Sequence, residues 1–139
     1  MGFSKQRQRE NFPSGIGIGA VQALTGASTA TDVFSHGVTK INSTAAGTAG
    51  AHAFVMRSPK TGLLKTVVVN VDSTREVILC TNSTTVLFYG STHNIATFST
   101  GNAFRSIALV GLSTSSWGVL AKSTGVTLSA STIQTRNAL

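Results

Sequence analysis

Few residues of this chain have the type and spacing that catalysis or metal binding requires. The three histidines are His36, His52 and His93. Each lies on or beside a different expected strand, whereas a zinc site usually draws a closely spaced pair of ligands from one element. A hydrogen-bonded or exposed imidazole is therefore favoured over a metal ligand at each position, and no metal is expected.

Acid–base catalysis by paired carboxylates would have to use the four acidic residues, which are Glu10, Asp32, Asp72 and Glu76. Asp72 and Glu76 flank a turn beside Arg75, so turn capping explains them better than catalysis. No serine lies in the Gly-x-Ser-x-Gly elbow of the hydrolases. We therefore expect a protein without enzymatic activity.

The segment 15–20 formally matches the glycine fingerprint of dinucleotide-binding proteins. That fingerprint binds a pyrophosphate only where it follows a strand and opens a helix. Here a charged segment precedes it, and Thr25-Gly26 interrupts the short run after it. No cofactor is expected.

The N-terminal segment is polar, basic and then rich in glycine. Its first twelve residues include Lys5, Arg7, Arg9 and Phe12. Pro13 disfavours a helical conformation for the residue that precedes it. Fully extended, the first fourteen residues would reach on the order of 45 Å. We predict an extended arm over residues 1–26, ending in a short amphipathic piece, and a single β domain over residues 27–139.

The body alternates short apolar runs with turn residues about every ten positions. Such spacing is typical of an all-β sandwich or barrel, and we expect a compact antiparallel one. The expected strands are 32–36, 38–42, 52–57, 64–71, 76–80, 85–89, 94–98, 106–112, 117–121 and 126–129.

The longest run, Thr66–Val71, is apolar on both faces for several residues. Its alternate members Val67, Val69 and Val71 would lie either inside the sandwich or against a neighbouring subunit. Trp117, the only tryptophan, is favoured as a core anchor, with an interface hot spot as the alternative.

The composition points to protein contacts. Only 11% of the residues are charged, against about 25% in ordinary soluble domains, which predicts that much of the surface faces other protein. The net charge is +7, but the basic residues are scattered, so no specific nucleic-acid readout is expected. No apolar run is long enough to span a membrane.

Four short motifs carry a resemblance to a known class of proteins. They are Gly37-Val-Thr-Lys-Ile-Asn-Ser43, the turn Ser58-Pro-Lys-Thr-Gly62 before a valine-rich strand, Gly101-Asn102 before Ser106-Ile-Ala-Leu-Val110, and Ser116-Trp117-Gly-Val before Gly125-Val-Thr-Leu128. Over these stretches the chain resembles the small β-structured modules of tailed-phage virions, namely head decoration (cement) and fibre-like proteins.

The resemblance implies a homo-oligomer, favoured as a trimer, that sits on the outer capsid surface of a virion. It further implies that the partner is the major capsid protein and that Lys5, Arg7, Arg9 and Phe12 contact the shell. The function would be to bridge and stabilise capsomers.

Two alternatives remain at this point. A fibre or tail receptor-binding module would need exposed aromatic side chains at a tip, for which the candidates are Phe88, Tyr89, Phe98 and Phe104. A small coat protein would direct its basic arm toward nucleic acid, but the arm has only three basic residues and counterion release scales with the number of phosphates neutralised.

Overall fold

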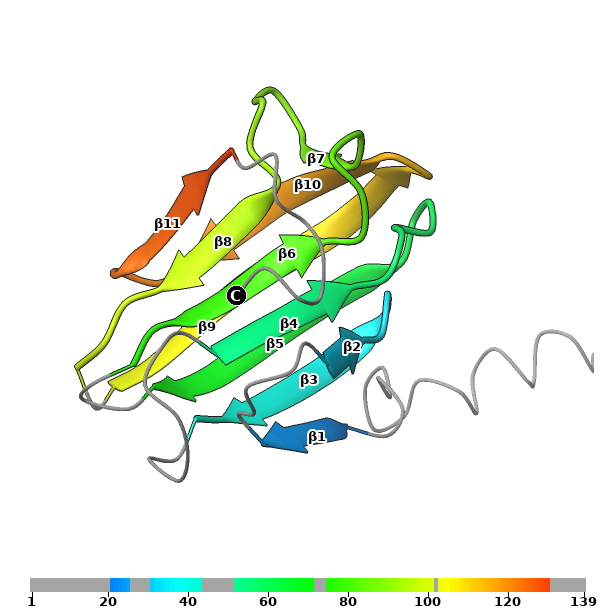
Figure 1. The fold of residues 1–139 in the computed structure, drawn as a ribbon. Helices are drawn as coiled ribbons and strands as arrows, with labels where there is room; N and C mark the ends of the chain where they lie inside the picture. The colour runs from blue at the N-terminus through cyan, green and yellow to red at the C-terminus, as the bar shows by residue number, and fades with distance from the viewer. Residues whose placement is uncertain (1–20, 26–30, 44–51, 72–74, 102, 131–139) are drawn as a thin grey trace, which may run out of the picture.

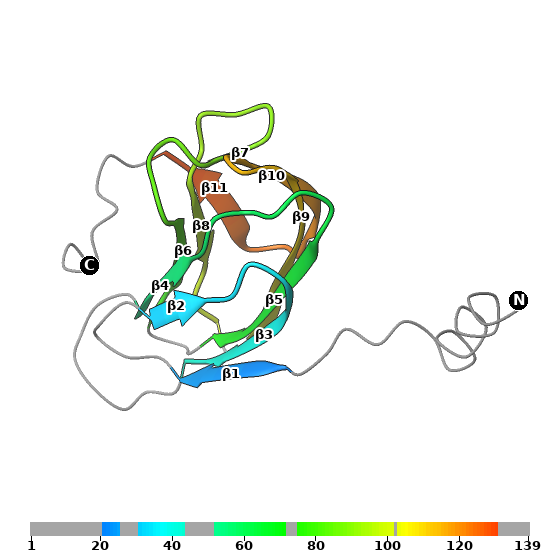
Figure 2. The same cartoon turned by 90° about the vertical axis from the view of Figure 1, so that its right-hand side faces the viewer.

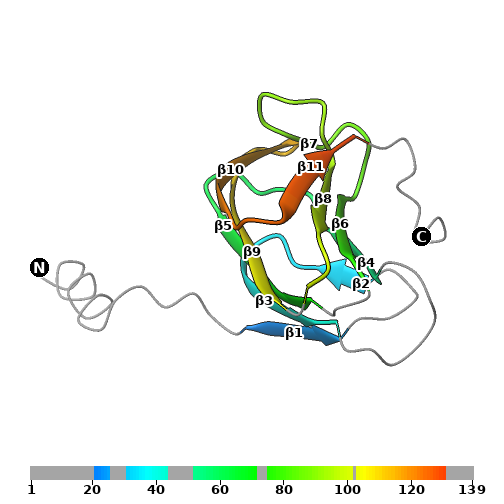
Figure 3. The ribbon, with the colours of Figure 1, turned by 90° about the vertical axis from the view of Figure 1, so that its left-hand side faces the viewer.

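The computed structural model describes residues 21–25, 31–43, 52–71, 75–101 and 103–130. These residues form eleven strands and contain no helix. Two sheets pack face to face, a six-stranded sheet A and a five-stranded sheet B. Sheet B lies in front of sheet A in Figure 1, and Figures 2 and 3 show both layers edge-on. The prediction of an all-β sandwich is confirmed.

Sheet A has six strands and sheet B has five. The order in sheet A is β1 (Gln22–Thr25), β3 (Gly37–Asn42), β5 (Leu64–Val71), β9 (Ala103–Ser113), β10 (Ser116–Lys122) and β7 (Leu87–Phe88). The order in sheet B is β11 (Val126–Ser129), β8 (Ile95–Phe98), β6 (Val77–Thr81), β4 (His52–Met56) and β2 (Thr31–Val33).

The strand pairing is mixed, which corrects the expectation of an antiparallel sandwich. From β1 to β9 each strand lies in the opposite sheet from the strand before it. Strands that neighbour each other in one sheet are therefore separated by a strand of the other sheet, and that strand serves as the crossover that parallel pairing requires. Pairs β1–β3, β3–β5, β2–β4 and β4–β6 are parallel, as is β7–β10, whereas β8–β11 and β9–β10 are antiparallel.

Strand β5 shows how the sequence divides its side chains between core and surface. Its residues alternate, so that Lys65, Val67, Val69 and Val71 face sheet B and are buried. The side chains between them, from Leu64 to Asn70, point away from the core. Full burial of one valine contributes roughly 1.5–3 kcal/mol, so the inward set fixes the register of this central strand.

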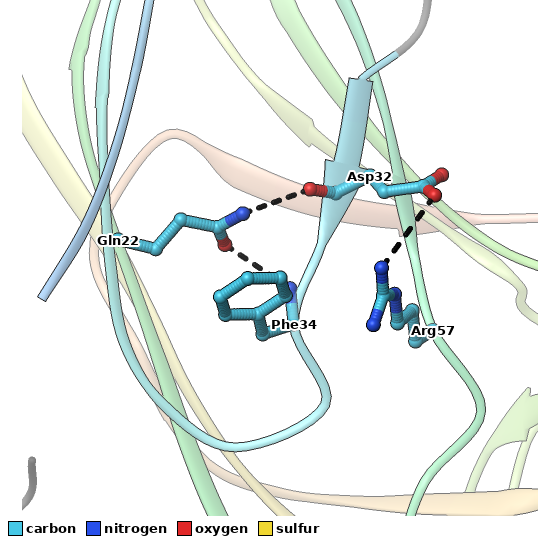
Figure 4. Close-up of polar contacts among 4 residues, drawn as sticks. All are labelled: Gln22, Asp32, Phe34 and Arg57. Carbon is cyan, nitrogen blue, oxygen red and sulfur yellow. Dashed lines mark hydrogen bonds and ion pairs between the residues drawn. The ribbon is translucent and has the colours of Figure 1, made fainter. Parts of the chain in front are cut away.

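The chain enters sheet A earlier than expected, because β1 pairs with β3 along residues 22–25. These residues, which the sequence pattern assigned to the arm, are thus an edge strand of the β domain. Gln22 joins this strand to β2 in the other sheet, as Figure 4 shows. Its side-chain nitrogen donates to the carbonyl of Asp32 (3.0 Å), and its oxygen accepts from the Phe34 amide (3.1 Å) and the Thr39 hydroxyl (2.8 Å).

Candidate functional site

The outer face of sheet A carries apolar side chains where a solvated sheet would carry polar ones. The register places Val38 beside Thr66, and Leu64 beside Val110, all on the side away from sheet B. We call this surface the apolar face of sheet A. Its apolar members are Val21, Val38, Leu64, Val68, Phe104, Val110, Leu112 and Leu120.

Several of these side chains are well exposed. Eight large hydrophobic residues are exposed in the described part of the chain, and five of them lie on this face. The exposed fraction reaches 76% for Phe104, 59% for Leu120 and 57% for Leu64. Single exposed apolar residues are normal, whereas a group on one face marks an interaction site.

The face is hollowed across β1, β3 and β5, next to the first residues of β9. The hollow has a volume of about 220 Å³ and is lined by Val21, Val38, Lys40, Ile41, Val68, Asn70 and Phe104. Lys40 is the only charged residue among the described strand residues that point outward from sheet A. Because so few charges would have to lose water, the face is suited to contact with another protein surface.

The residues singled out in the longest run lie in the core. Val67 and Val69 are 0% exposed and Val71 is 1% exposed, and Trp117 is 0% exposed. All four belong to one cluster of buried residues between the sheets. Val68, which lies between two buried valines, faces outward and is half-buried.

The aromatic candidates for a receptor-binding tip are divided. Phe88 and Phe98 are buried in the core, while Tyr89 and Phe104 are exposed. Tyr89 donates its amide to the carbonyl of Trp117, whose partner in β9 is residue 111. Phe104 lies seven positions earlier in β9, or about 23 Å away at about 3.3 Å per residue. The two exposed rings therefore do not form one tip.

The arm residues Lys5, Arg7, Arg9 and Phe12 lie outside the described residues. Among the residues that are described, no group of three His, Cys, Asp or Glu side chains could hold a metal ion. No helix in that part of the chain has the length and apolar character to cross a membrane. Cys80 is buried and has no disulfide partner, and burial raises the pKa of its thiol.

Sequence reasoning missed Lys65, which is fully buried on the side of β5 that faces sheet B. Its ammonium nitrogen donates to the hydroxyl of Thr39 and to the carbonyl of His36, the latter over 3.4 Å. Thr39 in turn donates to Gln22, so these groups form a chain of hydrogen bonds between β5, β3 and β1. Burial lowers the pKa of Lys65 to about 8.

The sequence held a signal for the apolar face, because the run Thr66–Val71 is apolar on both faces and was expected inside the sandwich or against a neighbouring subunit. A strand buried on one side alternates apolar and polar residues, but Val68 and Val110 stand next to inward-facing apolar residues. Runs that are apolar on both sides therefore indicate a second covered face.

Neither the protein-family models nor the curated proteins include a match to this chain.

Proposed function

We propose that the protein is a structural component of a virion, a capsid decoration subunit that binds the outer capsid surface and bridges and stabilises capsomers. The observation that carries this proposal is the apolar face of sheet A. A non-enzymatic protein that works by attachment needs a surface whose burial is favourable. This face offers exposed leucine and phenylalanine side chains, and Lys40 is the only outward charge among its described residues.

The size of the face fits such a contact. Five strands at about 4.8 Å spacing and six residues at about 3.3 Å give an outline of roughly 20 Å by 20 Å. The relief of the side chains gives more accessible area than this flat outline. A specific interface buries roughly 600–1,000 Å² on each partner, so the face is of the order that one small contact requires.

The proposed arrangement divides attachment between the domain and the arm. Lys5, Arg7, Arg9 and Phe12 would contact the major capsid protein, and copies of the chain would associate, with a trimer favoured. Two linked contacts bind more tightly than either alone, because the first raises the effective concentration of the second. A subunit attached in this way would join neighbouring capsomers without a large rigid interface.

The test measures attachment to emptied capsids of the virus that encodes the chain. We expect the full chain to cosediment with them at a fixed stoichiometry, and the double variant Phe104→Ser/Leu120→Ser to bind at least tenfold less. A second variant lacking residues 1–19 should fold but lose attachment. The matched control is Tyr89→Ser, which removes an exposed aromatic residue that follows the edge strand β7 and is not a member of the apolar face. Unchanged occupancy by both the double variant and the shortened chain would refute the proposal.

A further inference from the structure

A cleft separate from the apolar face lies where the turn after β2 meets the loops after β4 and β6. Its volume is about 460 Å³, within the range of ligand-binding sites. The side chains that matter for its chemistry are Asp32, Phe34, His36, Arg57, Lys60 and Asn82.

Arg57 is held in place at this cleft. Its guanidinium carbon lies 5.1 Å from the centre of the Phe34 ring, a cation–π distance. One guanidinium nitrogen lies 4.0 Å from a carboxylate oxygen of Asp32 (Figure 4). That separation allows attraction but is too long for a hydrogen bond, so the pair orients the guanidinium without using its N–H groups.

The surroundings fix both partners of Arg57. The Gln22 amide binds the backbone of Asp32 and Phe34 together, which sets the end of β2 (Figure 4). The ring of His36 stacks on Phe34, with centroids 6.4 Å apart and planes inclined by 14°. On the other side, Asn82 donates to the hydroxyl of Ser58 over 2.7 Å. The cleft is therefore assembled before a ligand binds, which lowers the cost of binding.

The cleft has many hydrogen-bond donors and little negative charge. Arg57 and Lys60 supply two positive charges, against one carboxylate among the described lining residues, that of Asp32. The side chain of Arg57 is 58% exposed. Its contacts with described residues are the Phe34 ring and the Asp32 carboxylate, and neither is a hydrogen bond. A guanidinium fork matches the two oxygens of a carboxylate, and Phe34 offers an apolar wall for the methylene groups beside it.

We propose that this cleft binds the carboxylate of an aspartate or glutamate in an acidic loop of a partner protein. The inference rests on the proposed function for the partner, which would be the capsid shell, and it adds the chemistry by which the partner is recognised. Nucleic acid fits less well, because Arg57 already covers the Phe34 ring on which a base would stack and the cleft offers only two cations to the backbone.

The test is an NMR titration of the isolated full chain at low salt. The added ligand is a synthetic peptide, Gly-Glu-Gly-Asp-Glu-Gly. We expect saturable shifts at Phe34, His36 and the Arg57 side chain. Arg57→Gln should weaken binding by about tenfold or more, since it removes a charge-assisted hydrogen-bonding group. Arg57→Lys should recover only part of the loss, because lysine keeps the charge but lacks the fork.

Lys40→Gln is the matched control, because it removes one exposed positive charge from the apolar face instead of the cleft. The inference is overturned if this control weakens binding as much as Arg57→Gln, or if the peptide with Gln and Asn in place of its acids binds equally well. It is also overturned if oligothymidylate or glucuronate shifts the cleft signals while the acidic peptide does not. The peptide titration involves no capsid, so its failure leaves the proposed function standing. Capsids that do not bind the unmodified chain refute the proposed function and leave the chemistry of the cleft intact.

Discussion

Replacing Lys65 with methionine tests whether the buried amine destabilises the sandwich in its charged form. The amine is 0% exposed, and its hydrogen-bonding partners among the described residues are a hydroxyl and a carbonyl, neither of which is charged. Methionine is flexible and fills irregular space in a core. The Thr39 hydroxyl keeps its bond to Gln22 in the variant, so the loss of polar contact is small.

The magnitude follows from the pKa of Lys65. Burial lowers this pKa from 10.5 to about 8, and each unit corresponds to about 1.4 kcal/mol. The full shift would make the charged amine cost roughly 3 kcal/mol, and residual solvent screening reduces this to about 1–2 kcal/mol. We expect Lys65→Met to be more stable than the unmodified chain by about 1 kcal/mol at pH 7, after the loss of the amine's own bonds is included.

The sign of the pH dependence is fixed by proton binding. Between pH 8 and 10.5 the unfolded chain keeps the proton that the folded chain has released, so the free energy of unfolding rises with pH in this window. The advantage of Lys65→Met should therefore shrink above pH 8, disappear near pH 9 and reverse toward pH 10. Cys80, whose pKa is raised by burial, makes an opposite contribution at alkaline pH, but it is present in both proteins and cancels in the difference.

The assay is urea unfolding from pH 7 to pH 10, followed by the fluorescence of Trp117, the single and fully buried tryptophan. The quantity that matters is the difference in free energy of unfolding between the two proteins. A difference that stays constant across this range, or a variant that is less stable by more than 1 kcal/mol at pH 7, would refute the account of Lys65 as a desolvated charge.

Two further substitutions test the packing of the sandwich. Gly111→Ala should cost at least about 2–3 kcal/mol, because the new methyl group would overlap the backbone of Lys60. Gly118→Ala, which meets only movable side chains, should cost less than about 1 kcal/mol, and equal losses in urea unfolding would contradict this. Gln22→Ala removes three hydrogen bonds and should cost about 1–3 kcal/mol, with faster hydrogen exchange at the Phe34 amide. Unchanged exchange there would show that Gln22 does not hold β1 to β2.

The sequence alone determined that the chain is built of strands, and where many of them lie. A period of two is a local property that follows from the pleat of a strand, so β5 was predicted with its observed bounds, residues 64–71. The turns were equally readable, because Gly62, Gly90 and Gly125 adopt positive φ, a conformation that glycine reaches without strain.

The tertiary structure alone decided how the strands pair and which apolar residues are covered. Apolar and polar residues alternate in the same way whether the neighbouring strand is parallel or antiparallel. The sequence therefore held no local signal that successive strands lie in opposite sheets. The same holds within β5, where Lys65 is buried and Val68 lies on the outer face. Which side of a strand meets the core depends on contacts with residues distant in the sequence. Residue type therefore predicted strands, whereas their partners across the sandwich decided which side chains form the core and which form the surface.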